Sequence, residues 1–252
     1  MIDALPVLRF AILLARPGFL LATTPVFGSS FAPPAVKIGL TVILAFVLAP
    51  LVTIPATPAP LAVALLVLHE CVVGFALGLS IRLLVAAAEV AGQLAGFQMG
   101  FGYAATVDPQ TGARNSLLAA LYGLLTVFTC LAVNAHHAVI RALVQSYEVL
   151  PVGLLHAGAA LPKQVASALG LVIALGAQLA APVVAVLVLV EVALGLLAHA
   201  APAMNLMALG FPVRLLAGLA MLGGSVAVLP GVMAHAVPAA LRIAARLAAA
   251  LH

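Results

Sequence analysis

Residues 164–190, QVASALGLVIALGAQLAAPVVAVLVLV, run from Lys163 to Glu191 without one charged side chain. This stretch exceeds the roughly 20 residues that a helix needs to cross the hydrocarbon core of a bilayer. Further charge-free stretches of at least that length cover residues 38–69, 115–140, 192–213 and 215–241. Their apolar residues are continuous, whereas the strands of a membrane β-barrel alternate apolar and polar side chains. The sequence therefore predicts an all-α, polytopic integral membrane protein.

The composition of the whole chain supports a membrane environment. Hydrophobic residues make up 66% of the sequence, charged residues make up 6%, and the mean hydropathy is +1.33. A soluble domain carries roughly 25% charged residues. The ten Lys and Arg residues give a net charge of +4 without forming a basic run. We therefore expect contact with membrane lipid and no nucleic-acid partner.

Proline residues divide the chain into about six apolar segments. These segments are 7–27, 38–54, 61–86, 117–150, 165–200 and 213–241. Pro182, Pro202 and Pro212 lie inside or beside apolar runs, where the missing N–H group breaks or kinks a helix. Non-helical backbone at membrane depth is tolerated only where it packs against protein or lines water. We expect broken helices at these prolines and a chain that packs among other helices.

Five charged residues lie within or at the edges of the apolar runs. They are Arg16, Glu70, Arg82, Glu89 and Glu191. An ionisable group at membrane depth is costly, so it usually faces a partner, a cavity or water. We predict that these residues contribute to packing between subunits. Pairing within the chain, or extension of the side chain to a membrane surface, is the alternative for each of them.

Residues 96–112, GFQMGFGYAATVDPQTG, form a glycine-rich segment between apolar runs. Glycines permit sharp turns of the backbone, and Asp108-Pro109 is a typical start of a turn. Large apolar side chains in such a segment can close a narrow passage, which then gates by losing its water. The composition thus makes these residues candidates for a pore element: Phe97, Met99, Gly100, Phe101, Gly102, Tyr103, Asp108, Pro109 and Gly112. An ordinary connector between two helices is the alternative.

The sequence contains no arrangement of residues that indicates reaction chemistry. His136 and His137 are adjacent, and adjacent side chains on a helix point about 100° apart, so both cannot easily face one metal ion. No nucleophile motif and no nucleotide-binding glycine motif is present. Cys71 and Cys130 lie in apolar runs, where we expect buried side chains rather than a disulfide. We expect no enzyme activity, no cofactor and no metal.

Several blocks of sequence, in order along nearly the whole chain, carry a resemblance to a known family. They are Ala15-Arg16-Pro17-Gly18, His69-Glu70-x-x-x-Gly74-x-x-x-Gly78, Gln98-Met99-Gly100 through Val107-Asp108-Pro109-Gln110, His136-His137 with Ser146-x-x-x-Leu150-Pro151-x-Gly153, and Glu191-x-x-x-Gly195 through Ala201-Pro202-x-Met204-Asn205 to Gly210-Phe211-Pro212. This order resembles the FliR family of flagellar export-gate membrane proteins. The family is related more distantly to the SctT proteins of virulence type III secretion. Asp108-Pro109-Gln110 and His136-His137 favour the flagellar branch.

The resemblance implies a function that composition alone does not. It implies a single FliR-type membrane domain, residues 1–252, that assembles with FliP and FliQ into a helical pore, next to FlhB and FlhA. That pore lies in the flagellar basal body of the bacterial inner membrane, and unfolded flagellar proteins pass through it. Residues 1–159 would be a FliP-like part that includes a plug segment, 96–116, and residues 160–252 a FliQ-like helical hairpin. The resemblance adds Val107 to the plug candidates.

Three alternatives to a flagellar gate subunit follow from the same sequence. The first is the equivalent SctT gate subunit of a virulence secretion system. The second is a small-molecule transporter, which would use broken helices near the middle of the membrane, with Pro182 and Pro202 as the candidates. The third is a membrane enzyme, which would need a catalytic constellation that the sequence does not contain.

Overall fold

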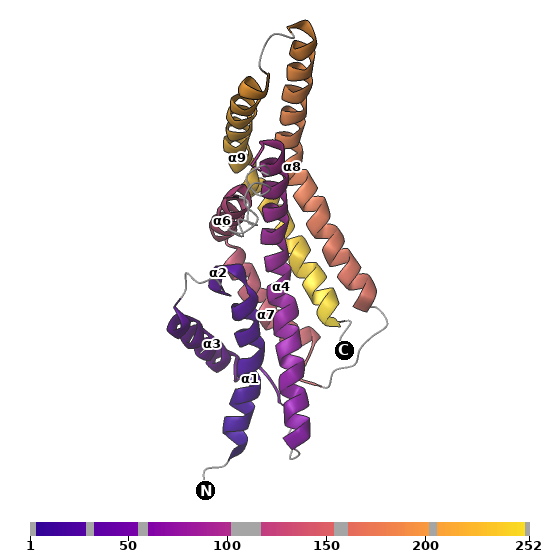
Figure 1. Ribbon diagram of the computed structural model, residues 1–252. Coiled ribbons are helices and arrows are strands. Elements are labelled where there is room, and N and C mark those ends of the chain that lie inside the picture. Colours follow the sequence, from indigo (N-terminus) through magenta and orange to yellow (C-terminus); the bar gives the residue numbers. More distant parts are fainter. Residues whose placement is uncertain are drawn as a thin grey trace. The chain divides into compact units, whose positions relative to one another are not determined.

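The computed structural model describes residues 4–28, 33–54, 60–101, 117–153, 161–201 and 206–249, and within these ranges the secondary structure is helical (Figure 1). The helices are α1 (Ala4–Thr23), α2 (Pro25–Gly28), α3 (Pro34–Leu48), α4 (Pro60–Gln98), α6 (Leu117–Ala132), α7 (Ala135–Val149), α8 (Leu161–Ala200) and α9 (Leu206–Ala249). The described part of the chain contains no strand, so the prediction of an all-α fold is confirmed.

Three helices are long and apolar enough to cross a membrane. They are α4, α8 and α9, and the pair α6 and α7 adds a fourth crossing if it is counted as one bent span. The prediction of a polytopic membrane protein is therefore confirmed. Helix α3 has 15 residues, which gives a length of roughly 22 Å, shorter than the hydrocarbon core of about 30 Å.

The sequence predicted one apolar segment over residues 117–150, but the structure divides it. Helix α6 ends at Ala132 and α7 begins at Ala135, and between them Asn134 has a φ of 57°, in the left-handed region. Asn is one of the few non-glycine residues that enter this region readily, because its short polar side chain hydrogen-bonds locally. The hydrophobicity of the run hid the break, which depends on one polar residue.

Two of the predicted helix breaks are corrected by the structure. Helix α8 continues through Pro182, and α9 continues through Pro212. Each proline removes one backbone hydrogen bond from the interior of its helix, yet neither residue ends the helix. Pro202 lies outside the described residues, in the interval between α8 and α9.

The chain forms two compact units, and three long helices contribute residues to both. The first unit comprises residues 1–83, 134–171 and 235–252, and the second comprises residues 84–133 and 172–234. In the first unit α3 packs beside α1, with Ala45 and Leu48 buried (Figure 1). In the second unit a cluster of apolar residues forms the core: Ala95, Met99, Leu118, Val183 and Leu187.

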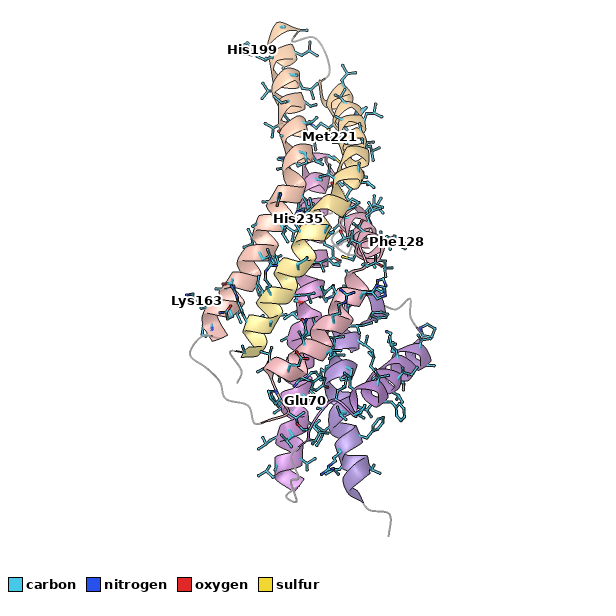
Figure 2. The ribbon with its side chains drawn as sticks, turned by 180° about the vertical axis from the view of Figure 1, so that it is seen from behind. Glu70, Phe128, Lys163, His199, Met221 and His235 are labelled. Atoms are coloured by element: carbon cyan, nitrogen blue, oxygen red, sulfur yellow. The ribbon has the colours of Figure 1, made fainter. Side chains whose placement is uncertain are left out.

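The long helices expose much of their apolar surface. In the most apolar window of α8, 22% of the residues are buried within the chain, and in that of α9 the fraction is 11%. Large side chains are exposed along these helices, as are aromatic ones elsewhere, such as Phe128, which projects from α6 (Figure 2). Such a surface is stable only against lipid or against other apolar helices.

Candidate functional site

The most polar buried arrangement in the described chain is centred on Arg16 of α1, which has no exposed surface. Its guanidinium meets the carboxylate of Glu70, which lies on α4 (Figure 2), in a two-point contact. The Nε group donates to Oε2 at 2.8 Å, and Nη2 donates to Oε1 at 2.8 Å. This fork geometry is the strongest form of an arginine–carboxylate pair. It gives each charge an ionic partner within the chain.

Helix α7 and the residues that follow it complete this arrangement. The Nη1 group of Arg16 donates to Oγ of Ser146 at 3.0 Å, and Nη2 also donates to the carbonyl oxygen of Leu150 at 3.0 Å. The ring of Tyr147 lies 4.0 Å from Cζ of Arg16, within the range of a cation–π contact. We call Arg16, Glu70, Ser146, Tyr147 and Leu150 the Arg16 cluster. It joins α1, α4 and α7 through directional bonds.

His69 lies next to the Arg16 cluster without forming an ion pair of the usual kind. Its Nδ1 atom is 3.7 Å from Oε1 of Glu70, but the backbone N–H of Gly153 donates to the same Nδ1 at 3.4 Å. A nitrogen that accepts a hydrogen bond carries no proton. His69 therefore fixes the segment after α7 to α4, and the charge of Glu70 is balanced by Arg16.

Two glycines on α4 explain how α1 comes close enough for the pair to form. Glu70, Gly74 and Gly78 are spaced by four residues and so lie on one face of the helix. A Cβ atom at Gly74 would collide with the carbonyl group of Arg16, and one at Gly78 would collide with the side chain of Thr23. The two helices thus touch at backbone distance, as small-residue spacing allows in membranes.

The charged residues outside the Arg16 cluster are in different surroundings. Glu191 of α8 and Arg214 of α9 are 3.2 Å apart, with 44% and 35% of their side-chain surfaces exposed. Arg82 and Glu89 are exposed on α4, in the first and second units respectively. Three of the five predicted charges thus have a partner within the chain, which was the alternative to pairing between subunits. For Arg82 and Glu89 the role in subunit packing stays a prediction.

The start of the predicted plug segment is described, and its residues differ in environment. Phe97 is 67% exposed, whereas Met99 has no exposed surface. Gly100 has a φ of +92°, and a Cβ atom there would lie 3.3 Å from the ring of Phe211. Phe101 packs against the apolar core of the second unit. The remaining candidates lie outside the described residues: Gly102, Tyr103, Val107, Asp108, Pro109 and Gly112.

Met99 is held by the helices on either side of it. Its neighbours in the core include Leu118 of α6 and Val183 of α8. On α9, a Cβ atom at Gly218 would lie 2.5 Å from Cγ of Met99, so the methionine occupies the space that a side chain would take there. The sequence marked Met99 as a group that could close a passage. Its burial instead assigns it to anchoring the end of α4.

The sequence reasoning missed several residues of these two sites. Ser146 and Leu150 were noticed only as parts of a family block, and Tyr147 was not noticed at all. Their contacts with Arg16 span more than 100 positions of the sequence, so no local period reveals them. The contact of Gly218 with Met99 gave no signal either, because glycine is common in this chain.

Comparison with known proteins decides what these two sites belong to. Residues 7–240 match the family described as Bacterial export proteins, family 1. The chain belongs to this family. It is 33% identical over 221 residues to the flagellar biosynthetic protein FliR of Pectobacterium carotovorum subsp. carotovorum, a match that covers 86% of this chain and 83% of the relative.

Other relatives of the chain carry the same description. FliR of Escherichia coli (strain K12) is 31% identical over 208 residues, which cover 81% of this chain and 78% of the relative. FliR of Bacillus subtilis (strain 168) is 31% identical over 225 residues, which cover 88% and 86%. The resemblance to the FliR family is therefore confirmed. This member of the family is a subunit of the flagellar export gate and a multi-pass protein of the bacterial inner membrane.

Proposed function

We propose that this chain is a non-enzymatic subunit that assembles with FliP and FliQ, next to FlhB and FlhA, and helps to form and seal the channel for unfolded flagellar proteins. The observation that carries the proposal is the unpacked surface of the α8 and α9 helices. They are long enough to cross a membrane, yet the most apolar windows are 22% and 11% buried within the chain. A transporter that works alone packs its crossing helices around an internal substrate site. Helices left this open fit a protein that completes its packing with other subunits.

The division of the chain into two related parts is also a proposal. Residues 1–159 would take the place of a FliP-like part, and residues 160–252 that of a FliQ-like helical hairpin. Helices α8 and α9 have 40 and 44 residues and lie on either side of the short interval at 202–205. This pattern is that of a helical hairpin. The Glu191–Arg214 pair links its two helices.

The sealing role is proposed for the segment that follows α4. Met99 is fully buried and Phe101 packs against the same core, so the chain enters this segment from a fixed point. A fixed entry keeps a short segment near one place in a channel, which a seal requires. Phe97 is exposed beside this point and can contact a neighbouring subunit or the passage itself.

Deletion of residues 101–112 tests the sealing role. We expect the complex with FliP and FliQ to assemble, because the deletion removes no part of α4 or α6, and we expect the passage to leak. The measurement is ion flux through vesicles that contain equal amounts of assembled complex. The replacement Phe128→Ala, which removes an exposed aromatic ring from α6, is the control and should leave the flux unchanged. An assembled deletion variant with normal flux would refute a plug in this segment.

A further inference from the structure

The two units of this chain differ in charge. Eight of the ten Lys and Arg residues belong to the first unit, and its described part holds two carboxylates, Glu70 and Glu148. Glu70 is committed to Arg16. The basic residues of this unit are Arg9, Arg16, Lys37, Arg82, Arg141, Lys163, Arg242 and Arg246. The first unit thus has a marked positive charge, which attracts anionic groups at a membrane surface.

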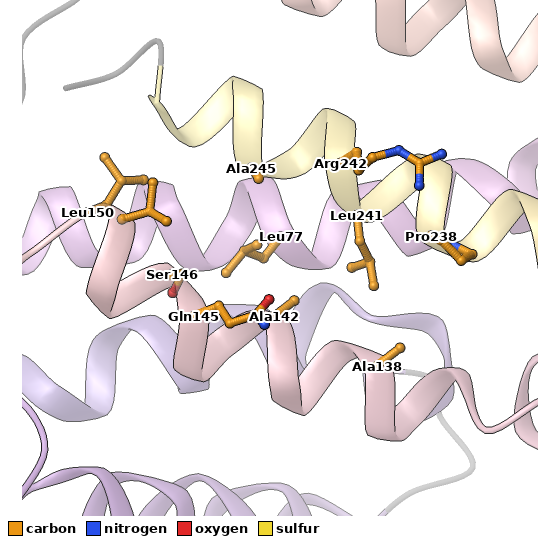
Figure 3. Close-up of a pocket in the computed structure, with 11 residues that line it drawn as sticks. Leu77, Ala138, Ala142, Gln145, Ser146, Leu150, Pro238, Leu241, Arg242 and Ala245 are labelled. Atoms are coloured by element: carbon orange, nitrogen blue, oxygen red, sulfur yellow. The ribbon is translucent and has the colours of Figure 1, made fainter.

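A pocket of about 320 Å³ lies in this unit between α4, α7 and the last turns of α9 (Figure 3). Its wall is mainly apolar and has several small side chains, including Ala138, Ala142 and Ala245, with Leu77 and Leu241 among the larger ones. The volume falls at the lower end of the range for small-molecule sites. The pocket is thus a narrow apolar groove that suits a hydrocarbon chain.

Two hydrogen-bond donors lie on this pocket without a partner in the described chain. Arg242 and Gln145 both line it, and both are exposed, which places them at its mouth. No carboxylate among the described residues is within ion-pair distance of Arg242. A guanidinium and an amide at the mouth of an apolar groove offer a positive charge and additional N–H groups to an anionic oxygen.

We propose that this pocket binds an anionic phospholipid, with an acyl chain along the alanine-lined wall and the phosphate at Arg242 and Gln145. The charge of the first unit, the apolar wall and the free guanidinium together fit an amphipathic anion. In a membrane the phospholipids are the abundant ligands of that kind. The floor of the pocket includes Ser146 and Leu150, which bind Arg16 on their other side. A bound acyl chain therefore also keeps water away from the Arg16 cluster.

The experiment is native mass spectrometry of the full-length chain, purified in detergent with its co-expressed partners and titrated with phosphatidylglycerol or phosphatidylcholine. We expect one phosphatidylglycerol to be retained per chain in preference to phosphatidylcholine. Arg242→Gln should weaken phosphatidylglycerol binding about fivefold, the effect of about 1 kcal/mol for one basic residue near an anionic lipid. Arg246→Gln is the matched control, because Arg246 is exposed on the same helix but does not line the pocket.

A second pair of variants tests the wall instead of the charge. Ala142→Phe fills the groove and should abolish retention of the lipid, whereas Ala166→Phe, at an exposed position on α8 in the same unit, should not. Equal retention of the two lipids by the unaltered chain would overturn the proposal. Equal losses in Arg242→Gln and Arg246→Gln, or failure of the assembled complex to retain any lipid, would overturn it as well. None of these readouts depends on export or on a plug.

Discussion

The two units of the chain hold their helices together in different ways. In the first unit the interior contains a fully buried Arg16 and Glu70, bonded to each other and to α7. In the second unit the core is an apolar cluster around Met99, and close helix contacts depend on glycines. Buried polar networks are directional and fail badly when one partner is lost. Apolar packing at small residues fails by steric overlap. The comparison therefore predicts different sensitivities to substitution.

The largest effect is expected from Glu70→Gln in the first unit. The substitution leaves the guanidinium of Arg16 buried without a countercharge, and breaking a buried ion pair in this way costs about 3–5 kcal/mol. The measurement is the free energy of unfolding of the full-length chain in mild detergent, by titration with sodium dodecyl sulfate. Glu148→Gln is the control, since Glu148 is exposed on α7 and should change stability by less than about 0.5 kcal/mol. Equal losses in the two variants would contradict the role given to the Arg16 cluster.

A smaller loss is expected from Gly92→Ala in the second unit. The added Cβ atom would lie 2.5 Å from the carbonyl oxygen of Leu118 and 2.8 Å from Cα of Ala119, both in the backbone of α6. Relief of such an overlap moves a helix, and overpacking of this kind costs about 1–3 kcal/mol.

The matched control for Gly92 is Gly223→Ala, on α9 in the same unit. A Cβ atom at Gly223 meets nothing within 4 Å, so this substitution should stabilise the helix by up to about 1 kcal/mol. The two glycines thus predict stability changes of opposite sign in the same titration. A gain in stability from both substitutions would show that α4 and α6 are not in backbone contact at Gly92.

The smallest effect is expected from Glu191→Gln. The pair with Arg214 joins α8 to α9 but is more than a third exposed, and exposed pairs contribute about 0–1 kcal/mol. The unfolding titration of the lone chain should therefore change little. A loss of several kcal/mol would show that this pair is shielded from water as strongly as the Arg16–Glu70 pair, and the contrast between the two would then fail.

The sequence predicted much of the fold, because long charge-free runs leave few alternatives to membrane helices. The boundaries moved by a few residues, as at 165–200, which became α8 from Leu161 to Ala200. Composition did not reveal the turn at Asn134 or the continuity of α8 through Pro182. Each of these depends on one backbone hydrogen bond or one dihedral angle, which an average over a segment does not contain.

The candidate sites were predictable in part. The cost of a charge at membrane depth singled out Arg16 and Glu70, and the spacing of Gly74 and Gly78 indicated a close helix contact. The pairing of the two charges was not predictable, because 54 residues separate them and only the packing of α1 on α4 brings them together. Met99 was recognised as bulky and apolar. Its burial against Gly218 depends on tertiary contacts that no period in the sequence encodes.

The central claim is that this chain completes its packing inside a larger export gate. The most direct test is co-expression of the tagged chain with FliP and FliQ from the same genome, followed by purification in detergent and native mass determination. We predict one complex that contains both partners and is much heavier than the 25.3 kDa chain. A stable 25.3 kDa chain that binds neither FliP nor FliQ would contradict the claim.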